Sequence, residues 1–73
     1  MVTKRPPITN RVRELRELHG AMSQAALGEA IGVTRQTVIA IEQGRYSPSL
    51  ESAFRIARQF CVGVEEVFGW EGE

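Results

Sequence analysis

Apolar residues recur every three or four positions in several short segments of the chain, which is the spacing of amphipathic helices. The first such segment predicts a helix that is capped by Thr9 or Asn10 and ends near His19. Its apolar positions are predicted to form a buried stripe and comprise Val12, Leu15 and Leu18.

The stretch from residue 23 to residue 44 predicts two short helices joined by a tight turn. Ser23 and Thr34 are typical helix N-caps, and Gly32 and Gly44 suit the left-handed backbone that often ends a helix. The inward positions are predicted to be Leu27, Ala30, Ile31, Val38 and Ile41. Gly28 is unusual inside a helix and is predicted to permit close approach of the next helix. Because only about three residues separate the two helices, they must cross steeply, as in a helix-turn-helix.

Two further helices are predicted downstream. Ser49 caps a helix from Leu50 to about Phe60, and a last short helix covers Glu65 to Phe68. The apolar face of the longer helix is predicted to comprise Leu50, Ala53, Phe54, Ile56, Ala57 and Phe60. The whole pattern predicts an all-α fold, a compact bundle of five short helices in one domain over residues 9–73. Residues 1–8 contain two prolines and are predicted to form a flexible arm, either a disordered terminus or a basic segment reaching DNA.

Composition restricts the function without identifying it. The chain has 73 residues, with nine basic and nine acidic side chains, which argues against non-specific coating of DNA. The charge is nevertheless uneven, since the first 45 residues carry a net +3 and the remainder −3. The chain offers no catalytic constellation and no metal-ligand cluster, so we expect neither an enzyme nor a cofactor. Without a signal peptide or a long apolar run, we expect a cytoplasmic protein with no membrane contact.

The outward positions of the third predicted helix are rich in side chains that can read base edges in a major groove. The candidates for base contact are Thr34, Arg35, Gln36, Thr37 and Ala40. Gln36 is the strongest of these, because glutamine can bond adenine bidentately, while Arg35 suits guanine or a phosphate. Ile39 is an apolar residue on this polar face and could meet the sugar–phosphate surface.

The run SQAALGEAIGVTRQTVIAIEQGRYSPSL resembles the helix-turn-helix domain of the Xre/Cro family of phage and bacterial repressors. The flanking segments LRELHG and RIARQF fit the same family, so the resemblance extends over about residues 9–68. It implies phosphate contacts from Gln24, Gln43 and Arg45. It also implies a structural ion pair between Arg16 and Glu42, which fixes the first helix against the end of the third.

Cys61 is the only cysteine, so no intramolecular disulfide can form. Lying between Phe60 and Val62, it is predicted to be a small core residue. Members of the Xre/Cro family, which this chain resembles, usually have glycine at this position. A left-handed backbone conformation is less favourable for cysteine than for glycine, so the turn after the fourth helix is expected to differ from the turn in the family.

One domain of this size contacts too few bases for selectivity, so we expect a homodimer on an inverted repeat of double-stranded DNA. The predicted interface comprises Val64, Val67, Phe68 and Trp70. The predicted function is that of a sequence-specific transcriptional repressor without a small-molecule ligand. The alternative is a protein-interaction module, such as an antitoxin or a bridging factor, with the same fold.

Overall fold

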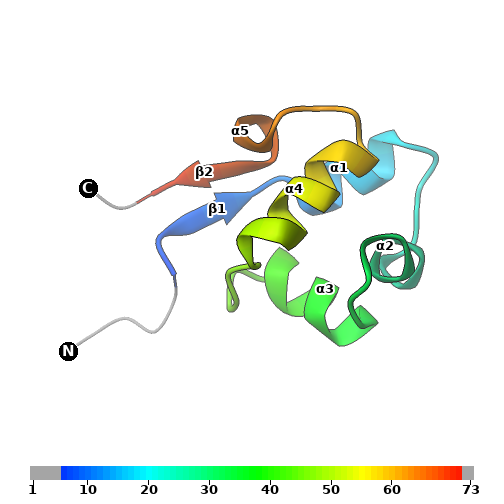
Figure 1. Cartoon of the computed structure of the whole chain (residues 1–73), viewed down its shortest axis with the longest axis horizontal. Coiled ribbons are helices and arrows are strands. Elements are labelled where there is room, and N and C mark those ends of the chain that lie inside the picture. The colour runs from blue at the N-terminus through cyan, green and yellow to red at the C-terminus, as the bar shows by residue number, and fades with distance from the viewer. Residues whose placement is uncertain (1–5, 72–73) are drawn as a thin grey trace.

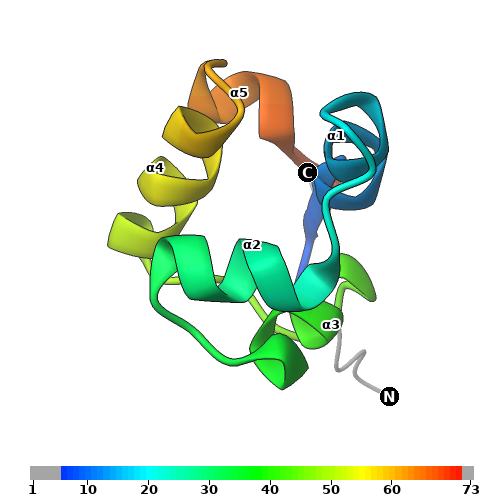
Figure 2. The same ribbon diagram turned by 90° about the vertical axis from the view of Figure 1, so that its right-hand side faces the viewer.

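The computed structural model describes residues 6–71, which form five helices and a two-stranded antiparallel sheet (Figure 1). The helices are α1 (Val12–Leu18), α2 (Gln24–Ile31), α3 (Arg35–Glu42), α4 (Leu50–Gln59) and α5 (Val64–Val67). The strands are β1 (Ile8–Asn10) and β2 (Phe68–Trp70). Helix α2 lies between α1 and α4 when seen from the side, with α3 beneath it (Figure 2).

Polar side chains begin three of the helices as predicted. The hydroxyl of Ser23 accepts from the backbone N–H of Ala26 at 2.9 Å, and that of Thr34 accepts from Thr37 at 3.1 Å. Ser49 does the same for α4, since its Oγ lies 3.0 Å from the backbone nitrogen of Ser52. These bonds satisfy donors that the first turn of a helix leaves free, and they fix where α2, α3 and α4 start.

One apolar core joins all five helices. It comprises Val12, Leu15, Leu27, Ile31, Val38, Ile41, Ile56, Ala57, Phe60 and Val67. Four residues predicted to face inward are exposed instead: Leu18, Ala30, Leu50 and Phe54. Helical geometry explains Leu18, because two steps of three residues rotate it about 120° away from Val12. In α4 the buried face is centred between Ala53, Ile56 and Ala57, which leaves Phe54 beyond its edge.

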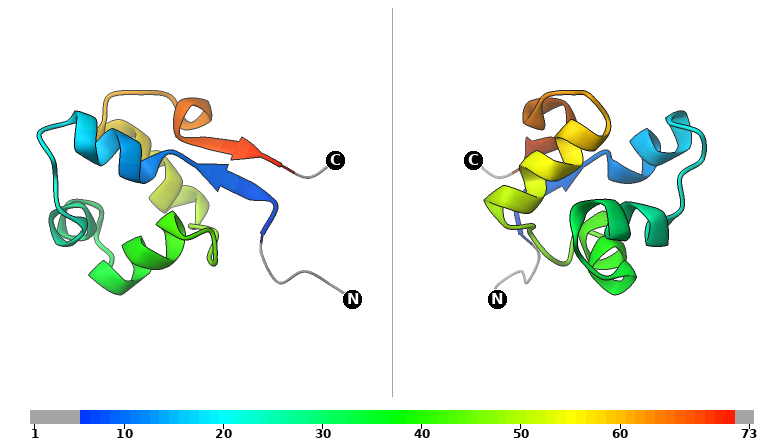
Figure 3. Two further views of the ribbon diagram at one scale, coloured as in Figure 1. Left: turned by 180° about the vertical axis from the view of Figure 1, so that it is seen from behind. Right: turned by 45° about the vertical axis from the view of Figure 1, so that its right-hand side comes forward.

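The sheet corrects the prediction of an all-α fold. Ile8 pairs with Trp70, Thr9 with Gly69 and Asn10 with Phe68, so the start of the described chain lies beside its end (Figure 3). Ile8 therefore belongs to β1 rather than to an arm over residues 1–8, most of which lies outside the described residues. Phe68 ends α5 in an extended conformation instead of continuing the helix. β-branched and aromatic side chains favour such strands, but short strands this far apart leave no periodic signal.

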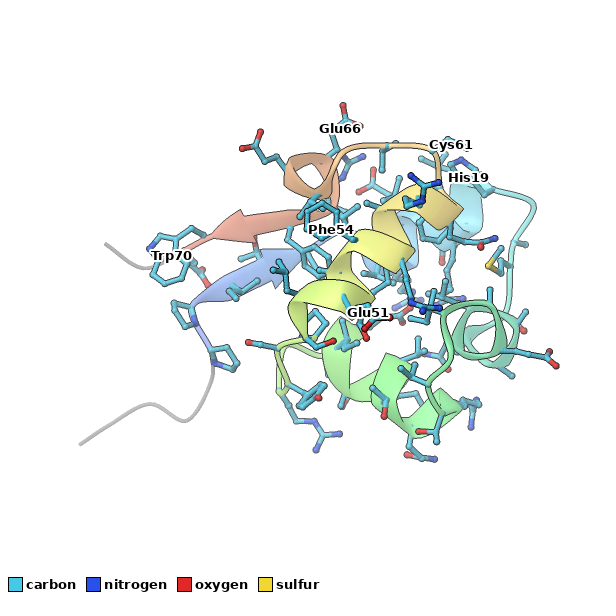
Figure 4. All side chains as sticks on the ribbon, viewed as in Figure 1. His19, Glu51, Phe54, Cys61, Glu66 and Trp70 are labelled. Carbon is cyan, nitrogen blue, oxygen red and sulfur yellow. The ribbon has the colours of Figure 1, made fainter. Side chains whose placement is uncertain are left out.

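The turn after α4 keeps a glycine-like geometry although it contains cysteine. Cys61 has φ 58°, and the backbone N–H of Val62 donates to the carbonyl of Ala57 at 3.0 Å. Cys61 therefore adopts the left-handed conformation that was expected to be unfavourable for cysteine. Cys61 is also exposed rather than a core residue, whereas the neighbouring Phe60 is buried (Figure 4).

Candidate nucleic-acid interface

Two glycines allow the tight turn between α2 and α3: Gly32 in the turn itself, and Gly28 inside α2, against which the turn packs. Gly32 has φ 83°, and its backbone N–H donates to the carbonyl of Gly28 at 2.8 Å. A β-carbon at Gly28 would lie 2.7 Å from the carbonyl oxygen of Val33 and 3.3 Å from that of Thr34. Gly28 therefore permits the predicted close approach, and its immediate neighbour is the backbone of the turn that leads into α3.

Helix α3 presents its N-terminal end to solvent. Thr34, Arg35 and Gln36 are exposed, whereas Thr37 and Ala40 are partly buried. The hydroxyls of Thr34 and Thr37 lie 3.0 Å apart, and Thr34 also caps the helix. The two threonines thus hold the start of the helix, and Arg35 and Gln36 are the side chains that project most freely from it.

Arg16 and Glu42 form the predicted ion pair across the fold. Arg16 Nε donates to Glu42 Oε2 at 2.6 Å, and Nη2 donates to Oε1 at 3.1 Å. The side chains are only 12% and 7% exposed, respectively. Arg16 Nη1 also donates to the carbonyl of Met22 at 2.7 Å. This network holds α1, the α1–α2 connection and the end of α3 together.

Gln24 takes part in the same network. Its Nε2 donates to Glu42 Oε1 at 3.1 Å, so the side-chain amide lies against the ion pair instead of pointing into solvent. Gln24 is partly buried, and it links the first turn of α2 to the last turn of α3. A phosphate contact from Gln24 stays a prediction, and it requires that this side chain share its hydrogen bonds with Glu42.

A cleft of about 610 Å³ opens where α1, α2 and α3 meet. Of the predicted DNA contacts, it is lined by Gln24, Arg35, Ile39 and Gln43. Arg35, Ile39 and Gln43 are spaced four residues apart and therefore share one side of α3. Gln36, Ala40 and Arg45 lie outside the lining, so the predicted contacts divide between the cleft and the remaining surface of α3. Arg13, for which the resemblance also suggests a phosphate contact, lines the cleft from α1, and so does Glu17, to which sequence reasoning gave no role in the site.

The predicted dimer residues differ in exposure. Val67 is 1% exposed and belongs to the core, so it cannot contribute to a surface as predicted. Val64 and Phe68 are partly buried, and Trp70 is 64% exposed. The reason is that Val67 ends α5 facing the core, whereas β2 carries Trp70 beyond the helices (Figure 4).

The apolar surface that includes Val64 and Phe68 extends further than the sequence pattern predicted. A groove of about 350 Å³ lies between α4, α5 and the strands and is lined by Ile8, Pro48, Leu50, Ala53, Val64 and Phe68. Leu50 is 74% exposed, and Phe54 lies one helical turn further along α4 with 52% exposure. Both were assigned to the core from their spacing, which cannot distinguish one edge of a helix from the other.

Helices α2 and α3 are joined by three residues, and the capped start of α3 is exposed, an arrangement that is typical of helix-turn-helix proteins. The comparison with known families agrees, because residues 12–67 match the family model described as helix-turn-helix. The chain belongs to the Xre/Cro-like helix-turn-helix family of DNA-binding transcriptional regulators, which is not a class of enzymes.

Several known proteins are similar to this chain. The chain is 53% identical over 64 residues to the uncharacterized HTH-type transcriptional regulator YgzD of Bacillus subtilis, covering 88% of this chain and 96% of YgzD. It is 45% identical to a Methanocaldococcus jannaschii regulator of the same type, with the same coverage. The crystal structure of the restriction-modification controller protein C.AhdI from Aeromonas hydrophila superimposes with a TM-score of 0.70 at 32% identity. That match covers 77% of this chain and 83% of C.AhdI.

Two further properties of residues 6–71 bear on function. They contain no grouping of three or more histidine, cysteine, aspartate or glutamate side chains that could hold a metal ion. None of their helices is long and apolar enough to span a bilayer.

Proposed function

We propose that this regulator binds a specific double-stranded DNA sequence as a homodimer and acts as a repressor. In this proposal α2 and α3 form the helix-turn-helix unit, and α3 lies in the major groove with its N-terminal half against the bases. The site would be an inverted repeat with half-sites about one helical turn apart. The observation that supports it most is the exposure of Arg35 and Gln36 at the start of a helix whose position is fixed by the turn and by the Arg16–Glu42 pair.

The assignment of contacts follows the two surfaces of α3. Gln36 would read a base, with Thr34, Thr37 and Ala40 beside it, because glutamine offers a donor and an acceptor that match adenine. Gln24, Ile39, Gln43 and Arg45 would face the sugar–phosphate backbone and set the register. Arg35 lines the cleft yet stands at the start of the helix, so it can reach either a guanine or a phosphate.

Selection of bound sequences from a random DNA pool by the purified protein tests the function as a whole. We expect an enriched inverted repeat at near-physiological salt. If nothing is enriched and binding is weak and salt-sensitive, sequence-specific regulation through this domain is wrong. A protein-interaction module that uses the apolar groove would then be the better account of the fold.

Replacing Gln36 by alanine is expected to relax base preference at one position of the selected site, at a cost of about 1–3 kcal/mol in binding free energy. The matched control is Arg45→Ala, which should weaken all DNA sequences similarly and flatten the salt dependence by about one ion. Competition binding with single-base variants of the site measures both effects. A Gln36→Ala protein that keeps its full preference would refute the role given to Gln36.

We propose that the dimer contact is formed by the apolar groove between α4, α5 and the strands, together with the exposed side chains of Phe54 and Trp70 beside it. In a β-strand alternate residues share a face, so Phe68 and Trp70 lie on the same side of β2, and Ile8 is paired opposite Trp70. Ile8 and Phe68 line the groove, which puts Trp70 on the groove's side of the sheet. Together with Leu50 and Phe54 this is an extensive apolar surface for a small domain, and such surfaces mark interaction sites.

Replacing Leu50 by glutamate is expected to raise the dimer dissociation constant by about ten-fold or more, because a charge would be buried in an apolar contact. Sedimentation at micromolar concentrations measures the change. Leu18→Glu is the matched control, since Leu18 is 67% exposed on α1 and does not line the groove. Equal behaviour of the two variants, or a wild-type protein that is monomeric at every concentration, would exclude this surface as the interface.

A further inference from the structure

The cleft between α1, α2 and α3 holds two kinds of ion pair. The Arg16–Glu42 pair is largely buried and ties the fold together. The second pair is formed within α1, where Arg13 Nε donates to Glu17 Oε2 at 3.3 Å. Its side chains are 76% and 61% exposed, so it contributes little to stability. An exposed pair of this kind can be broken by a competing charge.

The cationic groups of the cleft are suited to a phosphodiester. Arg13 and Arg35 enter it from α1 and α3, and Gln43 adds an amide from the end of α3. Among residues 6–71, Arg35 makes no ion pair with a carboxylate, whereas the Arg13 guanidinium is engaged by Glu17. Glu17 thus presents to this cleft a carboxylate with the same sign of charge as a phosphate, and it engages Arg13, one of these two arginines.

We propose that Glu17 limits the affinity of this cleft for a DNA phosphate by holding Arg13. This inference rests on the proposed function. That function names residues that strengthen DNA binding, and Glu17 is a residue that weakens it. When DNA enters the cleft, Arg13 exchanges the Glu17 carboxylate for a phosphate oxygen, and Glu17 is left facing the DNA backbone. Affinity is then set below the level that the arginines alone would give, which makes binding more readily reversible.

The test compares charge-neutralising variants on the DNA duplex recovered by selection. Glu17→Gln is expected to bind about three-fold more tightly, and its affinity should fall more steeply with salt, by about one additional released counterion. Glu14→Gln is the matched control. Glu14 is on the same helix, loses the same charge and is paired with Arg11 at 3.0 Å, but it does not line the cleft. Equal gains from both variants would show a general charge effect and overturn the proposal.

Repeating the Glu17→Gln substitution in an Arg13→Gln protein distinguishes two mechanisms. Glu17 could lower the affinity by binding Arg13, or by directly repelling the DNA phosphates. If Glu17 acts through Arg13, the gain from Glu17→Gln should largely disappear in the double variant, since there is no arginine to release. A gain that persists undiminished overturns the assigned mechanism. If the wild-type protein selects no DNA sequence, the proposed function itself is wrong. If the wild-type protein selects a site and Glu17→Gln leaves the affinity for that site unchanged, only this inference is wrong.

Discussion

Replacing Glu42 by alanine is expected to lower the free energy of unfolding by about 3 kcal/mol, which corresponds to a fall in melting temperature of roughly 10–20 °C for a domain of this size. Arg16 is 12% exposed and would lose both carboxylate bonds, while Gln24 would lose its acceptor. A buried charge without a partner is costly because neither water nor protein compensates it. Thermal or urea unfolding of the two proteins measures the loss.

The control for Glu42→Ala is Glu51→Ala. Glu51 is paired with Arg55 at 2.7 Å on α4, but these side chains are 72% and 54% exposed, so its removal should change stability by less than about 1 kcal/mol. If the free energy of unfolding falls by the same small amount in both variants, the Arg16–Glu42 pair does not have the structural role that its burial indicates.

Replacing Gly28 by alanine is expected to destabilise the protein by about 1–3 kcal/mol, the opposite of the usual effect inside a helix. Alanine ordinarily stabilises a helix relative to glycine by about 1 kcal/mol. Here the new β-carbon would stand 2.7 Å from the Val33 carbonyl oxygen, so the turn must move. Because this turn positions α3, DNA affinity should fall together with stability. Urea denaturation and binding to the selected duplex measure the two effects.

Gly63→Ser provides the matched control for Gly28→Ala. Gly63 has an ordinary backbone conformation, with φ −80°, and a β-carbon there meets nothing within 4 Å. As the N-cap of α5 it should tolerate serine with no loss, and the hydroxyl can accept from the first turn. A Gly28→Ala protein that is as stable as Gly63→Ser would show that the turn adjusts without cost.

The parts of the fold that could be predicted from the sequence are those specified by residues close together in the chain. Ser23, Thr34 and Ser49 are followed by helical apolar spacing, and each caps its helix as predicted. The turn at Gly32 was recognisable for the same reason. In contrast, Arg16 and Glu42 are far apart in sequence, and only the resemblance to the family suggested that they meet.

The errors arose where distant segments decide the environment of a residue. The pairing of Ile8 with Trp70 leaves no local pattern, so the sheet was missed. Leu50 and Phe54 have the spacing of core residues, but no element of the described chain covers their edge of α4. The base and phosphate contacts remain predictions, because they depend on a DNA molecule whose sequence the chain does not specify.

The β1–β2 sheet has a consequence for the order in which the protein folds. Contacts among α2, α3 and α4 join residues that are closer in sequence than the two strands, which come from the two ends of the described chain. Local contacts form first, so the strands should close late and open first, and their strength should affect the unfolding rate more than the folding rate. Because Ile8 and Phe68 complete the apolar groove, that groove exists only in a fully closed chain. Incompletely folded chains therefore lack the surface through which we propose they dimerise, which restricts assembly to protein that has finished folding.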